Sequence, residues 1–383
     1  MNISIQKKKI AIVYDWIDSW GGVERVLLDL YQLFPHADFY TSYVDLDKAP
    51  WAKNLTIYPS FIQKLPNFIK KNRILSLPLY SYAFESFNLS QYDIVISISS
   101  AFAKGVITKP HTRHICYLLT PPRYLWGQSD DYETKSDLSW SAKFKKMLKQ
   151  LLVRRLRALD FIAAQRPDEI VSISNTVAAR CRKYYQRASD VLFPPFDIDY
   201  WSKLKNEVSA FDLPKQDKYY LVVSRLEPYK KVDLVISTFN RNKKRLVIIG
   251  RGTQKDKLTK MANKNIAFIE NVTDKQLALW YYHAEALIMP QEEDFGYVAL
   301  EAQLMGCPVV AYGVGGAVET VKENISGMFF ASQSEKALEE ALERLKVSAY
   351  NVRHTLHSIN SFLETFSKAQ FLNKMQSYIS DTL

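Results

Sequence analysis

Cysteine is scarce in this chain. The 383 residues contain three cysteines, Cys116, Cys181 and Cys307, which are widely spaced and form no Cys-x-x-Cys pair. We therefore expect buried thiols in a reducing compartment, and neither disulfides nor zinc ligands. The six histidines show no metal-ligand spacing either. The sequence thus predicts a protein without a metal site.

Long apolar runs are also missing. No stretch approaches the roughly 20 apolar residues that a membrane-spanning helix needs. The lysines near the N-terminus precede a short apolar run without a small-residue cleavage site, so a signal peptide is not expected. We therefore predict a cytoplasmic protein that is either soluble or attached peripherally to a membrane.

Acidic residues are too few in the first half of the chain to balance the basic ones. Residues 1–195 hold 27 Lys and Arg against 17 Asp and Glu, whereas the remaining residues hold 24 against 23. A basic half is typical of proteins that bind nucleic acid, anionic lipid or a phosphorylated substrate. None of the standard nucleic-acid-binding motifs is present, so nucleic acid is not an expected partner.

What the chain does have is a repeated alternation of apolar runs and helical patterns. Each run fits a buried parallel strand by its length and its Ile and Val content. The alternation predicts an α/β fold whose parallel sheets are covered by helices on both faces. The predicted strands are Lys9–Tyr14, Ala37–Tyr43, Tyr92–Ser97, Arg113–Leu118, Glu169–Ser174, Tyr219–Ser224, Arg245–Ile249, Ile266–Ile269, Ala286–Met289 and Pro308–Ala311.

The length of the chain indicates two domains. Pro194-Pro195 interrupts the alternation and Lys203–Lys218 is polar with little periodicity, so we place a linker at about 194–217. This gives an N-terminal domain over residues 1–195 and a C-terminal domain over 196–383. In two doubly wound domains the carboxyl ends of the strands, where ligands bind, are expected to face one cleft.

The segment Pro290–Glu301 carries the richest chemistry. A polar loop follows a predicted strand, and a helix is expected to begin near Phe295-Gly296. Main-chain N–H groups at such a helix start suit an anion, and Glu293 and Glu301 can accept hydrogen bonds from sugar hydroxyls. On spacing alone, an acidic first helical turn favoured by the helix dipole explains Glu293 equally well.

Three further loops carry candidate ligand-binding residues. Arg225 and Lys230 follow a predicted strand, where two cations would neutralise a pyrophosphate, although an ordinary basic turn is the alternative. Gly250-x-Gly252 follows another strand. Gly21-Gly22 follows the first strand, and the absence of a Cβ there lets main-chain amides approach a phosphate or an acceptor.

Together these segments resemble the motifs of glycosyltransferase family four. The matching segments are E-D-F-G and L-E-A around Glu293 and Glu301, G-x-P-V-V at 306–310, G-G-x-x-E at 315–319, R-L-x-x-x-K at 225–230 and G-G-x-E at 21–24. The resemblance implies the GT-B fold, two facing Rossmann-like doubly wound domains with a central cleft. It also implies a retaining hexosyltransferase whose nucleotide-sugar donor is a substrate, with no metal and no cofactor.

The resemblance assigns roles to individual residues. Glu293 would contact the transferred sugar and Glu301 the donor ribose. Arg225 and Lys230 would bind the pyrophosphate, and these two residues and Glu293 form the predicted catalytic set. The remaining predicted donor-binding residues are Gly22, Gly250, Gly252, Phe295, Gly296, Tyr297 and Leu119.

A second resemblance concerns the first domain. Ser99–Gly105 and Tyr117–Trp126 resemble segments of a bacterial subgroup that includes mannosyltransferases of O-antigen and exopolysaccharide assembly. The subgroup implies a GDP-linked mannose-like donor and a glycan or polyprenyl-linked acceptor. Gly21, Lys104 and Arg123 would lie on the acceptor side of the cleft.

Leu119 departs from the subgroup, which carries a histidine at this place. In relatives that imidazole contacts the donor sugar near its 6-hydroxyl, and leucine forms no hydrogen bond. Our hypothesis is that Leu119 packs against a C6 methyl, which favours a 6-deoxyhexose such as rhamnose or fucose. The alternative is that His114 or Arg123 takes over the role. Two other functions stay open: a different GT-B enzyme such as a nucleotide-sugar epimerase, or a sugar-nucleotide binding protein without catalysis.

Two basic amphipathic segments lie in the first domain. Lys143–Arg157 and Phe61–Leu79 combine cations with apolar residues, and in Lys143–Arg157 the apolar positions follow helical spacing. This pattern is typical of a helix on an anionic membrane surface, although a core-facing helix with a solvated basic face gives the same pattern. We also expect a last helix over Ile359–Ser380 that returns to the first domain. The triplets Asp45-Leu-Asp47 and Asp197-Ile-Asp199 are interpreted as chance.

Overall fold

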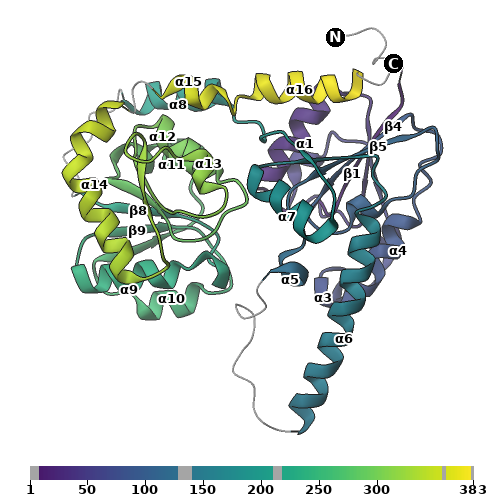
Figure 1. Ribbon diagram of the computed structural model, residues 1–383, viewed down its shortest axis with the longest axis horizontal. Coiled ribbons are helices and arrows are strands. Elements are labelled where there is room, and N and C mark those ends of the chain that lie inside the picture. The colour runs from purple at the N-terminus through teal and green to yellow at the C-terminus, as the bar shows by residue number, and fades with distance from the viewer. Residues whose placement is uncertain (1–7, 128–139, 210–217, 356–358, 381–383) are drawn as a thin grey trace. The chain divides into compact units, whose positions relative to one another are not determined.

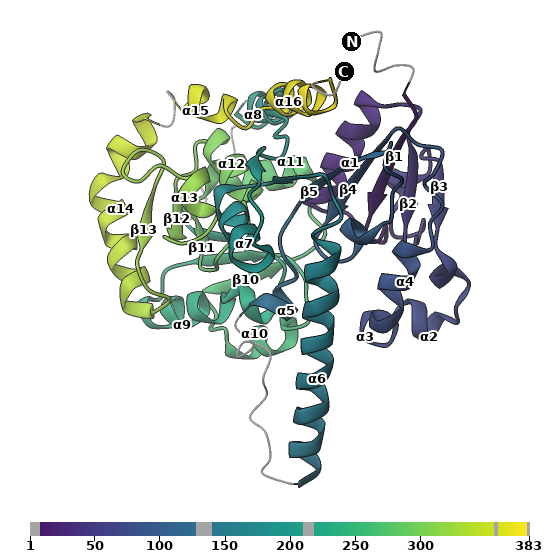
Figure 2. The same ribbon diagram turned by 45° about the vertical axis from the view of Figure 1, so that its right-hand side comes forward.

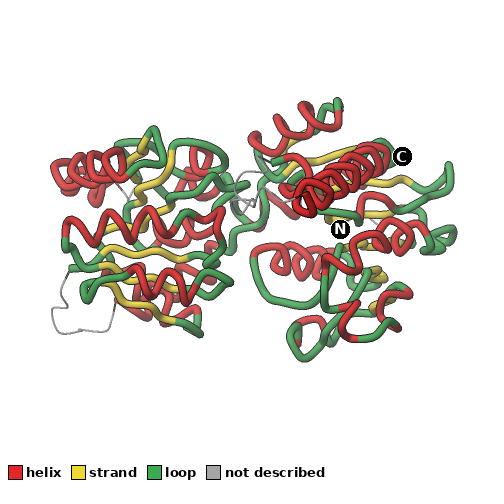
Figure 3. Tube along the Cα trace, turned by 90° about the horizontal axis from the view of Figure 1, so that it is seen from below, coloured by secondary structure: helices red, strands yellow, loops and turns green. Residues whose placement is uncertain are grey.

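The chain folds into two compact units. The computed structural model describes residues 8–127, 140–209, 218–355 and 359–380 (Figure 1). The first unit comprises Met1–Pro195 and Phe371–Leu383, and the second comprises Phe196–Gln370. In each unit the strands lie between helices (Figure 3), as a buried parallel sheet requires.

The first unit contains a seven-stranded parallel sheet with the order β3-β2-β1-β4-β5-β6-β7. Its strands are β1 Ile10–Tyr14, β2 Asp38–Thr41, β3 Ile57–Pro59, β4 Ile94–Ser99, β5 Arg113–Leu118, β6 Glu169–Ser172 and β7 Asp190–Val191. Its α-helices are α1 Gly22–Leu33, α2 Asn67–Lys70, α3 Arg73–Ser76, α4 Tyr80–Glu85, α5 Arg123–Trp126, α6 Trp140–Ala163 and α7 Asn175–Tyr185.

The second unit contains a six-stranded parallel sheet with the order β10-β9-β8-β11-β12-β13. Its strands are β8 Tyr220–Val223, β9 Leu246–Ile249, β10 Ile266–Ile269, β11 Ala286–Met289, β12 Val309–Tyr312 and β13 Gly327–Phe330. Its α-helices are α8 Ile198–Ser209, α9 Val232–Asn242, α10 Lys255–Met261, α11 Asp274–His283, α12 Tyr297–Leu304, α13 Ala317–Thr320, α14 Glu335–Thr355 and α15 Asn360–Glu364.

The ten predicted strands are all present, and their buried runs form the core of each sheet. Every residue of β1, β4, β9 and β11 is buried. All three cysteines are buried thiols, as the sequence predicts. The prediction of a linker at 194–217 is wrong for residues 198–209, which form α8. Trp201, Leu204 and Val208 bury one face of this helix in the second unit.

The last helix, α16 Lys368–Ser380, contributes to the first unit from Phe371 onward. Phe371 packs edge-on against Tyr117 of β5, with 5.7 Å between ring centroids. The hydroxyl of Tyr378 donates a hydrogen bond to Asp190 of β7 over 3.3 Å. The predicted single helix over 359–380 is broken into α15 and α16, because residues 365–367 leave the helical path.

Candidate functional site

The strand order of the second unit marks one place where a ligand is expected. The chain adds β9 and β10 on one side of β8 and β11, β12 and β13 on the other, so the order reverses between β8 and β11. Parallel sheets bind ligands outside the carboxyl ends of the strands at this switch point. The loops that leave these two strands are 224–231 and 290–296, which carry the predicted residues Arg225, Lys230 and Glu293.

Lys230 and Glu293 meet at this switch point. The ammonium Nζ of Lys230 lies 2.6 Å from Oε1 of Glu293, and the two side chains are only 11% and 15% exposed. The side-chain amide of Gln291 donates a second hydrogen bond to the same oxygen. Because both groups are largely withdrawn from water, removing either would leave the other as an uncompensated charge. The structure thus brings together two of the three residues that the sequence assigns to catalysis.

Two glycines hold the main chain of Glu293 in place. The N–H of Gly316 donates to the carbonyl oxygen of Glu293 over 2.7 Å. Gly315 has φ of +81°, and a Cβ on it would lie 2.5 Å from that same oxygen. Only glycine fits this approach, which gives a physical reason for the Gly315-Gly316 pair.

Arg225 lies on the exposed side of its loop. Its guanidinium donates to the hydroxyl of Tyr229 over 2.9 Å. The neighbouring loop after β9 packs closely against the same segment, because a Cβ on Gly250 would lie 1.8 Å from the carbonyl oxygen of Ser224. A Cβ on Gly252 would likewise lie 2.5 Å from the main chain of Leu226. Gly250 and Gly252 therefore permit the close contact of two loops at the carboxyl edge of the sheet.

Helix α12 carries the second predicted glutamate. Gly296, with φ of +106°, is the N-cap residue, and Tyr297 is the first helical residue. Glu301 lies one turn further, is buried, and accepts a hydrogen bond from the hydroxyl of Tyr281 over 3.0 Å. The buried ring of Phe295 packs edge-on against Tyr297, with centroids 5.3 Å apart. The predicted start of this helix near Phe295-Gly296 is confirmed.

The first unit has a corresponding switch point between β1 and β4, and the chain fills it with its own anion. The buried carboxylate of Asp15 accepts main-chain hydrogen bonds from Ser100, Ala101, Phe102 and Ala103 at 2.7 to 2.9 Å. Such a cluster of N–H groups is otherwise a phosphate site. Sequence reasoning missed this role of Asp15, although an aspartate directly after a buried strand was the available signal.

Gly21 and Gly22 lie at the start of helix α1 in the first unit. Gly21 is the N-cap residue of α1, and Gly22 is the first helical residue. Glu24 in the first turn is buried near Gly21, and burial raises the pKa of its carboxyl, with hydrogen bonds acting in the opposite direction. The hydroxyl of Tyr14 lies 3.4 Å from Oε1 of Glu24.

Lys104 has a different role from the one predicted for it. Its side chain is fully buried, and its ammonium lies 2.5 Å from Asp160 of α6. Asp160 also accepts hydrogen bonds from Trp126 at 2.6 Å and Tyr185 at 2.8 Å. The assignment of Lys104 to the acceptor surface is therefore corrected: a buried, paired ammonium joins α6 to its neighbours and offers no exposed donor.

Leu119 directly follows β5 and is buried, and its N–H donates to Ser99 over 2.9 Å. The alternative that His114 replaces the family histidine is wrong. His114 is fully buried near the start of β5, where its Nε2 pairs with the hydroxyl of Ser97 at 2.8 Å. Burial, reinforced by Arg187 and Arg166, lowers the pKa of His114 to about 3. Arg123, the first residue of α5, is half-buried and stays a candidate.

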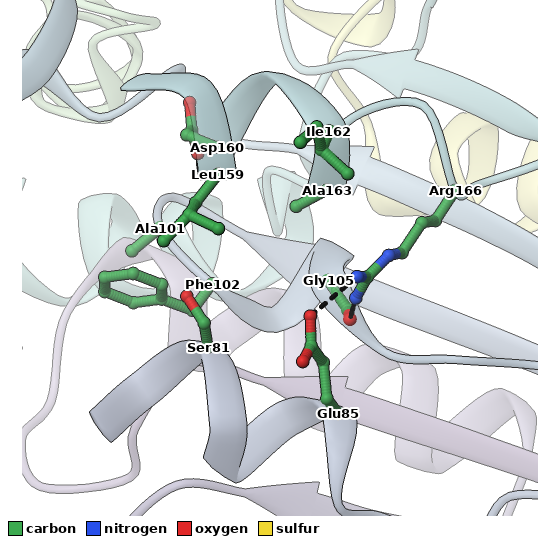
Figure 4. A pocket seen from close by; sticks show the side chains of 10 residues that line it. All are labelled: Ser81, Glu85, Ala101, Phe102, Gly105, Leu159, Asp160, Ile162, Ala163 and Arg166. Atoms are coloured by element: carbon green, nitrogen blue, oxygen red, sulfur yellow. Dashed lines mark hydrogen bonds and ion pairs between the residues drawn. The ribbon is translucent and has the colours of Figure 1, made fainter. Parts of the chain in front are cut away.

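A surface of the first unit exposes several large apolar side chains. We call it the α4–α6 surface, after the helices that border a shallow pocket lined by Phe102, Leu159 and Ile162 and closed at one side by an Arg166–Glu85 ion pair of 2.6 Å (Figure 4). Helices α2, α3 and α4 lie on the same side of this unit as α6 (Figure 2). The exposed large apolar residues of these four helices are Phe68, Leu75, Tyr82, Leu151, Leu152, Leu159 and Ile162.

The structure describes part of the predicted basic amphipathic segment Lys143–Arg157, which belongs to α6. Leu156 is buried, as a core-facing helix requires, whereas Leu151 and Leu152 are exposed beside the exposed Arg154 and Arg155. The side chains of 140–149 lie outside the described residues. Among the described residues, no helix combines the length and apolar character that crossing a bilayer requires, and no three His, Cys, Asp or Glu side chains gather as metal ligands.

Comparison with known protein families and sequences finds similarity to glycosyltransferases. Residues 205–357 match the family model of glycosyl transferases group 1. The D-inositol 3-phosphate glycosyltransferase of Mycolicibacterium smegmatis is 26% identical over 226 residues, 52% of this chain and 50% of that protein. The protein of the same name from Frankia alni is 31% identical over 178 residues, 41% of this chain and 44% of that one. The chain thus spans about half the length of the curated relatives it matches.

Solved structures match over nearly the whole chain. Anabaena HepE in complex with UDP and glucose has a TM-score of 0.67 at 15% identity, with 98% of this chain and 100% of that chain covered. Sucrose-phosphate synthase from Thermosynechococcus elongatus has a TM-score of 0.69 at 15% identity, with 98% and 99% covered. The two Rossmann-like parallel sheets are those of the GT-B fold, as predicted. The matches support the group 1 glycosyl transferase family, and the narrower likeness to bacterial mannosyltransferases stays a prediction.

Proposed function

We propose that this chain is a retaining glycosyltransferase that transfers a hexose from a nucleotide-sugar donor to a glycan or polyprenyl-linked acceptor. The observation that carries the proposal is the Lys230–Glu293 pair at the switch point of the second sheet, with Glu301 nearby on α12. A cation for a diphosphate and carboxylates for hydroxyls are the groups that such a donor needs. The family match over residues 205–357 supports the same assignment.

The proposed reaction divides the work among these residues. The bond between C1 of the sugar and the phosphate oxygen breaks, and the acceptor oxygen forms a new bond to C1 on the same face. The acceptor proton passes to the departing phosphate. Lys230 and Arg225 would stabilise the charge on that phosphate, while Glu293 would bind hydroxyls of the transferred sugar and Glu301 those of the ribose. A bound diphosphate would compete with Glu293 for Lys230, so donor binding would free Glu293 to turn to the sugar.

The donor sugar is proposed from Leu119. The sugar is mannose or a 6-deoxyhexose such as rhamnose or fucose, and a buried leucine, which offers a 6-hydroxyl no hydrogen bond, is the reason to include the 6-deoxy sugars. The subgroup resemblance favours a guanosine donor, whereas the similar Anabaena structure holds UDP. Both bases therefore belong in the test.

The acceptor side is proposed from the first unit. The exposed leucines and arginines of the α4–α6 surface suit an anionic membrane, and a lipid-linked acceptor is presented at such a surface. We place Gly21 and Arg123 on this side of the reaction, and Gly22 stays with the proposed donor-binding residues. Peripheral attachment to the cytoplasmic face of a membrane is part of the same proposal.

A thermal-shift panel of nucleoside diphosphates and their sugars tests the donor site. A ligand selective for the folded state adds about 2.7 kcal/mol of apparent stability at a hundredfold excess over its Kd. We expect one base to stabilise the chain, and Glu293→Gln to abolish turnover while diphosphate binding survives. Binding without turnover in the wild-type chain would favour a non-catalytic sugar-nucleotide binding protein, and interconversion of nucleotide-sugars without transfer would favour an epimerase. The absence of any shift would contradict the proposal.

A further inference from the structure

Tyr281 stands outside every motif that the sequence analysis identifies. It lies near the end of α11, and its side chain is fully buried. Its hydroxyl donates a hydrogen bond to Oε2 of Glu301 in α12 over 3.0 Å. The ring of Trp201 from α8 packs edge-on against Tyr281, with 6.3 Å between ring centroids. Three helices thus fix the position of one hydroxyl against one carboxylate.

The hydrogen bond determines how Glu301 can meet a ligand. A glutamate side chain has three rotatable bonds, and ordering a flexible side chain on binding costs about 0.5–1.5 kcal/mol. A carboxylate is planar, so holding Oε2 on the Tyr281 hydroxyl gives Oε1 one defined direction. A buried carboxylate also depends on its hydrogen-bond donors for stability. The carboxylate is therefore ordered before any ligand arrives.

We propose that Tyr281 is a positioning residue for nucleotide binding: it holds the Glu301 carboxylate in the orientation that accepts hydrogen bonds from the ribose hydroxyls of the donor. The inference rests on the proposed function, which assigns Glu301 to the ribose. It adds that the preference for a ribonucleotide over its deoxy form depends on a residue of α11.

The variant Tyr281→Phe removes the hydroxyl and keeps the ring. The matched control is Tyr219→Phe, because Tyr219 is equally buried in the same unit and also packs against a tryptophan, Trp280. Its hydroxyl donates a hydrogen bond to the main-chain oxygen of Trp280 over 2.8 Å, whereas the hydroxyl of Tyr281 donates to a carboxylate. Each variant thus loses one buried hydroxyl, and only Tyr281→Phe loses the hydrogen bond to Glu301.

The readout is a ratio of dissociation constants measured by calorimetry on the full chain. UDP, GDP, ADP and CDP are compared, and the tightest of them is then compared with its 2′,3′-dideoxy form. In the wild-type chain the ribonucleotide should bind more tightly. In Tyr281→Phe this preference should fall about tenfold, the effect of losing one hydrogen bond to a charged group. In Tyr219→Phe the preference should equal that of the wild type, even where both variants melt at lower temperature.

A double-mutant cycle tests whether Tyr281 acts through Glu301. If it does, Tyr281→Phe combined with Glu301→Gln should bind the ribonucleotide no more weakly than Glu301→Gln alone. Additive losses in the double variant, or an unchanged ribose preference in Tyr281→Phe, would overturn the inference and leave the proposed function intact. If the wild-type chain binds none of the four ribonucleotides, the proposed function is overturned, and this inference with it.

Discussion

Gln291 shows how much of the site depends on residues without a motif role. It is almost fully buried, and its amide shares Oε1 of Glu293 with Lys230. Because a carboxylate only accepts hydrogen bonds, the amide must present its N–H₂ to Glu293 and turn its oxygen away. Gln291 and Lys230 together fix the rotamer of Glu293.

We predict that Gln291→Glu is inactive at neutral pH and regains activity as the pH falls. The new carboxylate would repel Glu293 when ionised, whereas its protonated form donates the hydrogen bond that the amide supplies. Gln291→Met, which never donates, should lose about tenfold in kcat at every pH. The pH profiles of kcat for both variants and the wild type are the measurement. Parallel profiles for the two variants would contradict this role.

His114 gives a pH dependence of stability with a defined sign. Its folded-state pKa of about 3 lies below the ordinary value of 6.5, because burial disfavours the imidazolium. As the pH falls from 6.5 towards 3, the unfolded chain binds a proton that the folded chain does not bind, so stability is lost. The loss should approach about 1.4 kcal/mol per pH unit.

The variant His114→Gln should remove this dependence. Urea unfolding of wild type and variant at pH 7, 6, 5 and 4 gives the difference in unfolding free energy at each pH. We expect the variant to gain on the wild type by about 1.4 kcal/mol per unit below pH 6. A difference that stays constant with pH would contradict this, because it would show that His114 takes up its proton at the same pH in the folded and unfolded chains.

At the scale of single residues, motif positions were predictable and their supports were not. Glu293 and Lys230, which the structure pairs, were singled out by their places after strands and by the motif resemblance. Tyr281 and Asp15 were missed because a hydrogen bond between segments distant in sequence leaves no local pattern. Lys104 was misassigned for the same reason, since its partner Asp160 lies 56 residues away.

Among the elements, the loops at the carboxyl edge of the second sheet depend on glycine. Gly250 has φ of +150°, and an added Cβ would meet the carbonyl oxygen of Ser224 at 1.8 Å. Gly306, just beyond α12, has φ of +81° but has nothing within 4 Å of its added Cβ. The two positions share an unusual backbone and differ in the space around it.

We predict that Gly250→Ala is far more damaging than Gly306→Ala. Both variants pay about 1 kcal/mol for placing a side chain at positive φ, and only Gly250→Ala forces the β8 and β9 loops apart. Gly250→Ala should therefore cost several kcal/mol and abolish nucleotide binding, while Gly306→Ala should bind normally. Thermal unfolding and nucleotide titration of both variants give the comparison, and similar effects from the two would refute the close loop contact.

Strands were predicted from the sequence where it contains runs of Ile and Val. Runs of buried Ile and Val were recognised. Strands β3 and β7 were missed because they are edge strands of three and two residues, and β13 was missed because its sequence, Gly-Met-Phe-Phe, has no Ile or Val. Helix α8 was taken for a linker because its many polar residues concealed the helical spacing of Trp201, Leu204 and Val208. These three buried residues were the signal that distinguishes a helix from a linker.

On the scale of the whole molecule, the excess positive charge and the exposed apolar side chains of α6 occur in the same unit. The first half carries most of the excess positive charge, and the same unit exposes the apolar residues of the α4–α6 surface. Leu151, Arg155 and Leu159 lie at intervals of four along α6, so cation and apolar groups share one face. A surface of this composition matches the boundary between anionic headgroups and acyl chains.

We predict that the chain binds vesicles of phosphatidylcholine with phosphatidylglycerol, and that Leu151→Ser combined with Ile162→Ser releases it. Each of these side chains is 53% exposed, and burying such a side chain fully in the bilayer is worth about 1.5–3 kcal/mol. The double variant should therefore bind at least about tenfold more weakly.

The matched control, Ile325→Ser with Val347→Ser, removes two exposed apolar side chains of the second unit and should bind as the wild type does. Co-sedimentation at low and high salt is the measurement, because the arginine contribution weakens as the Debye length shortens. Equal binding by both double variants, or binding indifferent to phosphatidylglycerol, would show that this face serves another purpose.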